Sequence, residues 1–142
     1  MLSMPSKSSD PEKRLSEIRE NIRLAHSFVD GLEYDGFRDN QLVFYAVTRA
    51  LEIISEASRR LPHDMKARHP SIPWNEIAGA GNVYRHDYED VRQQLVWGTV
   101  HNQLPILLTA IEQELAQLGE LPNKNAGGGD MPPRGGKGGM DF

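Results

Sequence analysis

The chain has 142 residues, which suits one domain of ordinary size. Its formal net charge of −4 argues against a stand-alone nucleic-acid binder, and the lack of cysteine excludes disulfides and thiolate metal sites. No apolar run approaches the roughly 20 residues that cross a bilayer, and no signal-peptide pattern opens the chain, so we expect a cytoplasmic protein without membrane contact.

Composition divides the chain into three parts. Residues 1–10 are polar and rich in serine, and residues 120–142 contain runs of glycine and proline with almost nothing to bury. Segments that bury so little apolar surface cannot offset the entropy lost on ordering. We therefore expect a disordered N-terminus at 1–10, one helical domain at 11–119 and a flexible tail at 120–142.

The first two predicted elements are long amphipathic helices. Asp10 and Pro11 supply an N-cap and a first-turn proline, and Gly31 followed by Gly36 marks the end of the first helix. The second helix is expected from about residue 39 to residue 61, just before Pro62. The inward positions recur at helical spacing; they are Leu15, Ile18, Ile22, Ala25, Val29 and Leu32, then Leu42, Val43, Ala46, Val47, Ala50, Ile53, Ile54, Ala57 and Leu61.

A connector at 63–72, with a turn of helix near 65–68, leads to a third helix. Pro73 opens this helix, which is predicted to continue through Tyr88. Gly79 and Gly81 weaken it, and such a weakness suggests close approach of another backbone. The positions predicted to face the core are Trp74, Ile77, Gly81, Tyr84 and Tyr88.

The last predicted helix spans 89–118 and should kink at Pro105. Its inward positions are Val96, Val100, Leu104, Leu107, Leu108, Ile111, Leu115 and Leu118. Short connections between long helices favour antiparallel neighbours. We therefore predict an all-α fold, an up-down antiparallel bundle of four main helices, and association with a partner or a second copy would add to its stability.

The segment Gly81-Asn82-Val83-Tyr84-Arg85-His86-Asp87-Tyr88 concentrates groups that handle phosphate. On a helix, Asn82, Arg85 and His86 would share one side. An imidazole, which ordinarily titrates near neutral pH, beside a fixed guanidinium suits chemistry on a phosphodiester. The alternative interpretation is that these cations only interact with the dipole at a helix end, inside a solvated charge cluster.

Other candidates carry weaker signals. Glu52 and Glu56 lie one helical turn apart among arginines, which usually indicates an exposed charged face. Glu56 borders the apolar stripe and could reach toward Arg85 in a supporting role. His63 and His69 lack carboxylate partners at ligand spacing, and His26 and His101 stand alone, so we expect structural or solvated histidines and no metal. A P-loop and a serine nucleophile elbow are both absent from the sequence.

Several of these motifs together resemble a known family. The stretch 46–107 includes Ser55-Glu56-Ala57, His69-Pro70-Ser71-Ile72-Pro73-Trp74, the 82–88 motif, Trp97 and Leu104-Pro105. It resembles the HepT-like branch of the HEPN superfamily, and with the first helix the resemblance covers essentially the whole folded part. It implies an all-helical homodimer whose two motifs meet in a cleft at the twofold axis.

The resemblance also implies a function. HepT-like proteins are the toxin half of toxin–antitoxin pairs and act as metal-independent ribonucleases without a cofactor. Their partner is a minimal nucleotidyltransferase (MNT), which in some pairs transfers AMP to the motif tyrosine. The family pattern Arg-Asn-x-x-x-His-x-Tyr places its asparagine at Asn82, its histidine at His86 and its tyrosine at Tyr88. Gly81 stands where the pattern has arginine, and Arg85 lies one helical turn further on.

Three functional interpretations therefore remain open at the level of sequence. In the first, His86 is general base or acid, Arg85 stabilises the transition state and Asn82 positions the histidine or a phosphate oxygen of RNA. In the second, the chain is a weak or inactive binding module whose Tyr88 accepts AMP. In the third, a catalytically silent dimer only scaffolds the partner.

Overall fold

The computed structural model describes residues 10–126, with side chains through residue 119. Within this range every regular element is helical and no strand occurs. The predicted all-α class is confirmed. The elements are α2 (Pro11–Val29), α3 (Tyr34–Arg38), α4 (Gln41–Arg59), α5 (His63–Ala67), α6 (Trp74–Gly79), the 3₁₀ turn η1 (Val83–Arg85), α7 (Glu89–Gly98), the π-helical η2 (Thr99–Gln103) and α8 (Leu104–Ala126).

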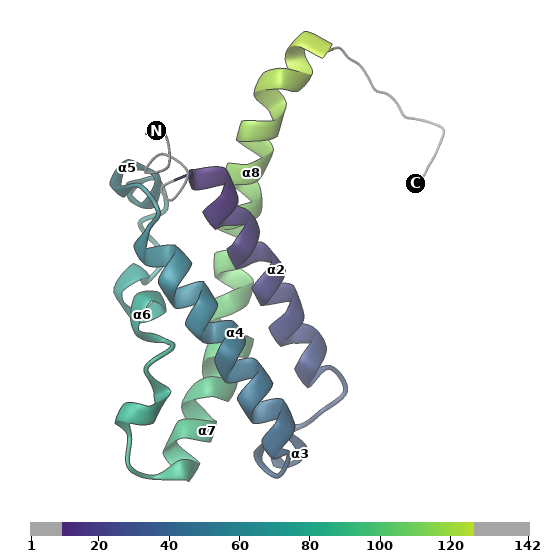
Figure 1. Ribbon diagram of the computed structural model, residues 1–142, viewed down its shortest axis with the longest axis vertical. Coiled ribbons are helices and arrows are strands. Elements are labelled where there is room, and N and C mark those ends of the chain that lie inside the picture. The colour runs from purple at the N-terminus through teal and green to yellow at the C-terminus, as the bar shows by residue number, and fades with distance from the viewer. Residues whose placement is uncertain (1–9, 127–142) are drawn as a thin grey trace, which may run out of the picture.

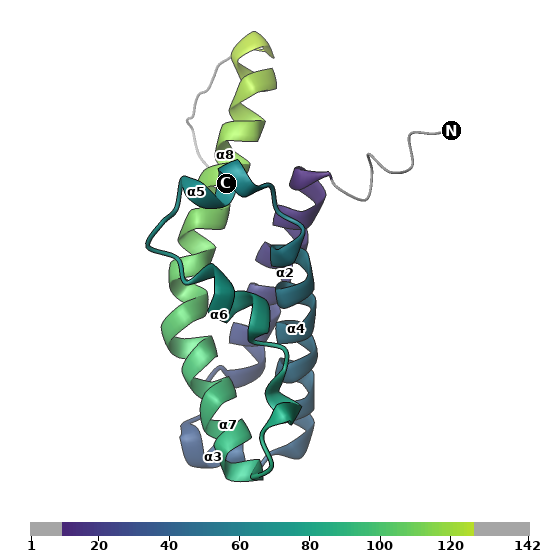
Figure 2. The same cartoon turned by 90° about the vertical axis from the view of Figure 1, so that its left-hand side faces the viewer.

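The chain traverses the bundle alternately in opposite directions. In Figure 1, α2 descends, α4 returns upward, and the last helical segment rises from α7 through α8. The segment that contains α6 and η1 descends between α4 and α7, as the rotated view makes plain (Figure 2). The predicted up-down arrangement is therefore present, although its fourth member is a short helix followed by irregular chain.

Helix boundaries follow the local sequence signals. The Asp10 carboxylate accepts the backbone N–H of Glu12 at 3.1 Å, and Pro11 occupies the first turn of α2. Gly31 has φ of +80°, a backbone conformation that costs glycine little. The Asn40 side chain caps α4 by accepting the N–H of Val43 at 3.1 Å. The short helix α3 between them was not predicted from the sequence.

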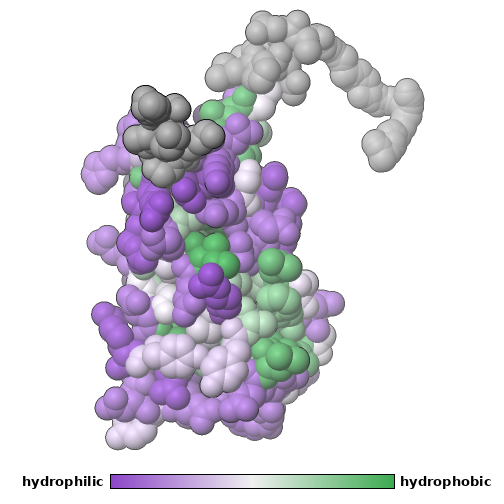
Figure 3. Space-filling view, viewed as in Figure 1, coloured by the Kyte–Doolittle hydropathy of each residue, from purple (hydrophilic) through white to green (hydrophobic). Residues whose placement is uncertain are grey.

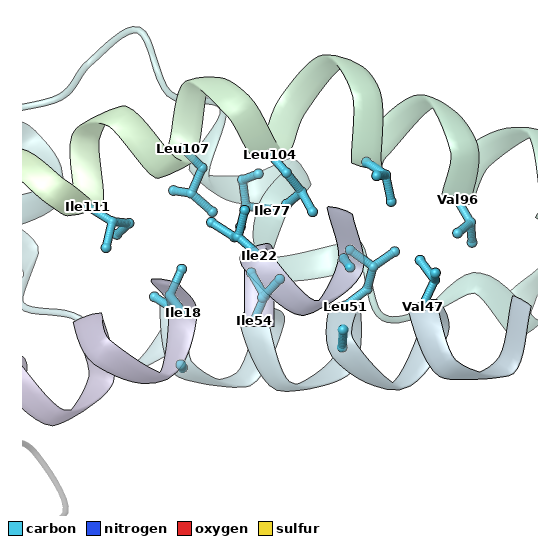
Figure 4. Packing of buried hydrophobic residues seen from close by; sticks show 14 of the residues in the cluster. Ile18, Ile22, Val47, Leu51, Ile54, Ile77, Val96, Leu104, Leu107 and Ile111 are labelled. Carbon is cyan, nitrogen blue, oxygen red and sulfur yellow. The ribbon is translucent and has the colours of Figure 1, made fainter. Parts of the chain in front are cut away.

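The core lies where α2, α4 and the α7–α8 segment face one another, with Ile77 of α6 covering it from the side (Figure 4). All residues predicted to face inward from the first helix are buried except Leu32, which lies beyond the end of α2 and is half-buried. The face of the molecule with α2 and α4 in front is mainly hydrophilic with small apolar patches (Figure 3). The largest fully buried side chains are Phe37, Leu15, Ile18, Ile22, Leu51, Ile54, Ile77, Leu104, Leu107, Ile111, Val47 and Val96.

Three residues predicted to face the core lie at the surface instead. Leu42 is 79% exposed, Tyr84 50% and Tyr88 75%. Leu42 lies in the first turn of α4. The inward positions at this end of the helix are taken by Phe44 and Val47. The two tyrosines are exposed because the helix on which the prediction placed them ends earlier than expected.

The predicted third helix is wrong beyond Gly79, and Ser55 of α4 supplies the physical reason. Its hydroxyl donates to the Ile77 carbonyl at 2.9 Å and accepts the N–H of Gly81 at 2.9 Å. In a continuing helix those two backbone groups would bond directly to each other. A side chain inserted into the i to i−4 ladder therefore ends α6.

The helix predicted at 89–118 is one rod of three segments. The π-helical turn η2 immediately precedes the site where a kink was predicted, because Pro105 has no N–H to bond the carbonyl four residues earlier. The rod continues to Ala126, and the part of the expected tail after that residue lies outside the described residues. None of the described helices combines the length and the apolar composition needed to cross a membrane.

Glu114 of α8 holds the 63–73 connector in place. It is buried, with its carboxylate accepting from Arg68 at 2.8 and 3.2 Å and lying 2.6 Å from Nε2 of His69. Hydrogen bonding by Arg68 lowers the pKa of this carboxyl, against the opposing effect of burial. His69 thus has a carboxylate partner 45 positions away, which its sequence surroundings did not indicate.

Candidate active site

The motif segment follows a path that is neither helix nor strand. After α6 it makes the 3₁₀ turn η1, and then His86 adopts extended backbone with φ −92° and ψ 135°. Tyr88 is the N-cap residue of α7. Arg92 of α7 fixes this stretch, since its guanidinium donates to the carbonyl of His86 at 2.8 Å.

Asn82, Arg85 and His86 nevertheless line one pocket. Its volume is about 340 Å³, and it lies between the end of α6, the motif segment and the side of α7 and η2. The structure therefore brings together the three residues predicted to be catalytic, although by a turn and an extended segment instead of one helical face. The lining residues are Asn75, Glu76, Gly79, Ala80, Asn82, Val83, Arg85, His86, Leu95, Thr99 and Gln103.

The functional groups of this pocket are accessible. The side chains of Asn82, Arg85 and His86 are exposed, and neither Arg85 nor His86 forms an ion pair with any described residue. A guanidinium without a carboxylate partner is available for an anionic ligand, which it can bind through two parallel hydrogen bonds. The pocket thus presents a fixed positive charge next to an imidazole.

The motif's two tyrosines lie outside this pocket. Tyr84 contacts Phe44 edge-on, with ring centroids 6.5 Å apart, and the Arg92 guanidinium lies 5.5 Å from the centre of its ring. Partial burial, together with nearby Tyr45, raises the pKa of the Tyr84 phenol. Tyr88 is much more exposed and is not among the residues that line the pocket. Of the two, Tyr88 is the more accessible to another macromolecule.

Glu56 does not take the position that the sequence suggested. It pairs with Arg59 at 2.8 Å and Arg60 at 2.9 Å, and it forms no ion pair with Arg85. Hydrogen bonds from Arg59 and then Arg60 lower the pKa of the Glu56 carboxyl. Arg59 also donates to the carbonyl of Ala78 in α6. Glu56 therefore orients an arginine that joins α4 to α6, and its contribution to the pocket is indirect.

Gly81 lies against α4, as the glycine content of this segment predicted. A Cβ at this position would lie 3.0 Å from the Cα of Glu52 and 3.3 Å from the Oγ of Ser55. At Gly79, by contrast, an added Cβ would meet nothing within 4 Å. The prediction of a close backbone approach is thus confirmed for Gly81 and wrong for Gly79.

Sequence reasoning missed several polar residues of the pocket. Glu76 and Gln103, from α6 and η2, are joined by a hydrogen bond of 2.8 Å and both line the pocket. Thr99 also lines the pocket, and Arg92 supports the His86 backbone. In the sequence, Glu76 could have been noticed as a carboxylate about one helical turn before Gly79. The position of Gln103 could not have been predicted, because it depends on the register of the π-helical turn η2, which no pattern in the sequence specified.

His26 and His101 have structural contacts, as expected. His26 lies 3.2 Å from the carbonyl oxygen of Val100, and His101 lies 2.9 Å from that of Trp97. Among the described residues no group of three or more histidines, aspartates or glutamates is arranged to hold a metal ion.

Comparison with known proteins identifies the family. The family described as "Ribonuclease HepT-like" matches residues 18–114, more than half of the chain. This chain belongs to the ribonuclease HepT-like family. The matched region contains α4, α6, the motif segment and most of the α7–α8 rod, so it includes every residue that lines the pocket.

Individual relatives agree with this assignment. The chain is 34% identical over 103 residues to "Putative RNase MJ1380" of Methanocaldococcus jannaschii, covering 72% of this chain and 94% of the relative. It is 37% identical over 99 residues to "Probable ribonuclease HepT" of Thermococcus cleftensis, covering 70% and 90%. It is 30% identical over 105 residues to "Putative RNase TTE0752" of Caldanaerobacter subterraneus, covering 74% and 94%. No solved structure matches the chain.

Position 81 is where this chain departs from the arginine-containing pattern that its sequence resembles. A Cβ at position 81 would lie 3.0 Å from the Cα of Glu52, so Gly81 lies directly against the backbone of α4. The only arginine that lines the pocket is Arg85. The pocket thus combines one guanidinium, that of Arg85, with one imidazole, that of His86.

Proposed function

We propose that this HepT-like protein is a ribonuclease that cleaves RNA through the RNA's own 2′-hydroxyl, without a metal ion or other cofactor. In this mechanism His86 transfers a proton and Arg85 stabilises the negative charge on the phosphate oxygens in the phosphorane-like transition state. Asn82 positions the imidazole or a phosphate oxygen. The observation that carries the proposal is the pocket of about 340 Å³ lined by all three side chains.

The electrostatics of the chain fit a substrate that is bound locally. With a net charge of −4, the protein lacks a general attraction for the RNA backbone. Recognition then depends on a few positive groups, and Arg85 is an exposed arginine without an ion-pair partner at the pocket. One such positive group at the point of reaction is enough for the cleavage of a single phosphodiester.

A cleavage assay tests the proposal. Purified protein should cleave RNA in the presence of a chelator and leave 2′,3′-cyclic phosphate ends. The His86→Ala variant should lose at least about a hundredfold in rate, the usual contribution of a general acid or base. Because His86 is exposed, the variant should remain folded. Cleavage at the wild-type rate by a pure, folded His86→Ala protein would refute the proposal.

We further propose that the chain is the toxin of a cytoplasmic toxin–antitoxin pair, as a homodimer neutralised by a minimal nucleotidyltransferase. Family membership and the RNase names of the relatives support the nuclease part of this role. Expression without the partner should arrest growth, and His86→Ala should relieve the arrest. Normal growth with abundant wild-type protein would count against the role as a toxin.

A second candidate function is favoured by the 75% exposure of Tyr88. In that case the chain is an AMP acceptor of low nuclease activity, and the partner modifies the Tyr88 phenol. The added AMP would bring negative charge and bulk to the motif segment, two residues after His86, and would compete with RNA. Intact mass spectrometry of co-expressed protein should detect AMP additions that disappear in Tyr88→Phe and persist in the control Tyr45→Phe. Persistence in Tyr88→Phe would exclude this acceptor.

A further inference from the structure

Cleavage through a 2′-hydroxyl requires two proton transfers. One group takes the proton from the attacking 2′-oxygen, and another gives a proton to the departing 5′-oxygen. His86 is the only histidine that lines the pocket, so a single imidazole must perform both transfers or share them with a second group. One other residue of the pocket carries a carboxylate that could take part.

Glu76 is the only carboxylate among the residues that line the pocket. It projects from α6, whereas His86 comes from the extended segment after η1. It forms no ion pair with Arg85 or His86, because no such pair lies within 4 Å among the described residues. Glu76, Arg85 and His86 therefore line the same pocket without forming ion pairs with one another.

The Glu76 carboxylate is also held in a defined place. Its Oε1 accepts a hydrogen bond of 2.8 Å from Nε2 of Gln103, which lies in the π-helical turn η2. The other oxygen makes no hydrogen bond with a described residue, so it can accept a proton from a substrate. Gln103 is thus a positioning residue for a carboxylate that has one oxygen available.

We propose that Glu76 is the general base of the reaction and His86 the general acid, an assignment that rests on the proposed ribonuclease function. The Glu76 carboxylate takes the proton of the 2′-hydroxyl while the 2′-oxygen bonds to phosphorus. The bond from phosphorus to the 5′-oxygen breaks, and the protonated imidazole of His86 gives its proton to that oxygen. The products are a 2′,3′-cyclic phosphate and a 5′-hydroxyl, and solvent restores both protonation states.

A leaving group that needs no proton separates the two roles. The probe is a short RNA whose scissile bridging 5′-oxygen is replaced by sulfur, compared with the unmodified RNA. A thiolate departs without a general acid, so His86→Ala should lose at least about a hundredfold on the normal RNA and recover most of that loss on the sulfur RNA. Glu76→Gln should lose a similar factor on both substrates, because attack by the 2′-oxygen still needs a base.

Two further variants complete the test. Glu76→Asp, which keeps the carboxylate, should restore part of the rate. Glu112→Gln changes an exposed glutamate of α8 that pairs with Arg23 outside the pocket, and it should cleave like wild type.

Each result separates this inference from the function on which it rests. Absence of cleavage by folded wild-type protein overturns the ribonuclease proposal, and the assignment with it. Cleavage by wild type and equally by Glu76→Gln overturns only the assignment, and would place the second proton transfer elsewhere, such as on His86 of a second copy. Recovery of Glu76→Gln on the sulfur RNA would make Glu76 the acid and would also contradict the assignment.

Discussion

At the scale of single residues, Gly81 and Ser55 together shape the motif segment. The Ser55 hydroxyl bridges the two backbone groups that would extend α6, and Gly81 is small enough to approach α4. This contact turns the chain out of its helix just before Asn82, so that Arg85 and His86 reach the pocket. Gly81 therefore has a structural role that a larger side chain could not share.

Substitution of Gly81 should lower the unfolding free energy, whereas substitution of Gly79 should not. In Gly81→Ala the new Cβ would press on the backbone of α4, and we expect a loss of about 1–3 kcal/mol in unfolding free energy. Gly79→Ala places a methyl group in open space at the end of α6 and should be neutral or stabilising by up to about 1 kcal/mol. Denaturant unfolding measures both, and equal effects would refute the packing argument.

At the scale of elements, the sequence predicted best where one helix follows its own periodicity. The stripe of α2 and the stop at Pro62 needed only local information, and both are confirmed. The predicted length of the third helix was wrong because the residue that ends this helix, Ser55, belongs to α4 and lies 22 residues before Ile77 in the sequence. The candidate site was found by its motif, whereas Glu76 and Gln103 join it through a contact across 27 residues that no local pattern records.

The buried carboxylate between α8 and the connector gives an element-scale prediction. Because the folded protein lowers the pKa of Glu114 below its ordinary value of 4.5, the group stabilises the fold above that pH. This stabilisation should be lost as pH falls through the lowered pKa. At pH 7 we expect Glu114→Gln to cost about 1–3 kcal/mol, since it removes the charge from hydrogen bonds with Arg68 and His69.

Thermal unfolding between pH 7 and pH 3 measures this dependence. The difference in stability between wild type and Glu114→Gln should be largest near neutral pH and should shrink under acid conditions. Glu112→Gln is a suitable control, because Glu112 is exposed and its pair with Arg23 is also exposed. A difference that stays constant over the whole pH range would show that the carboxylate charge is not what stabilises the connector.

At the scale of the whole molecule, the exposed apolar residues near the motif indicate where a second copy could bind. Leu42 and Tyr45 project from the start of α4, and Tyr84 lies against Phe44 of the same helix. Large exposed side chains gathered in one region are characteristic of interaction surfaces. The homodimer implied by family resemblance would cover this surface and would place two motif segments near each other.

The dimer surface can be tested by one substitution and a matched control. Sedimentation velocity should show wild-type protein as a dimer at micromolar concentration, and Leu42→Asp should shift it to the monomer by placing a charge in the interface. Leu24→Asp changes an exposed leucine of α2, which contributes no residue to the pocket, and should leave the dimer intact. A monomeric wild type, or dissociation by both variants alike, would contradict this interface.

We propose that Arg85 supplies the positive charge that acts on the scissile phosphate. Single-turnover cleavage of RNA by Arg85→Ala measures this most directly, with Arg49→Ala as the control, since Arg49 is exposed on α4 and pairs with Glu52 outside the pocket. We expect Arg85→Ala to cleave about a hundredfold to a thousandfold more slowly than wild type and Arg49→Ala to cleave like it. Cleavage by Arg85→Ala at the wild-type rate would contradict the account.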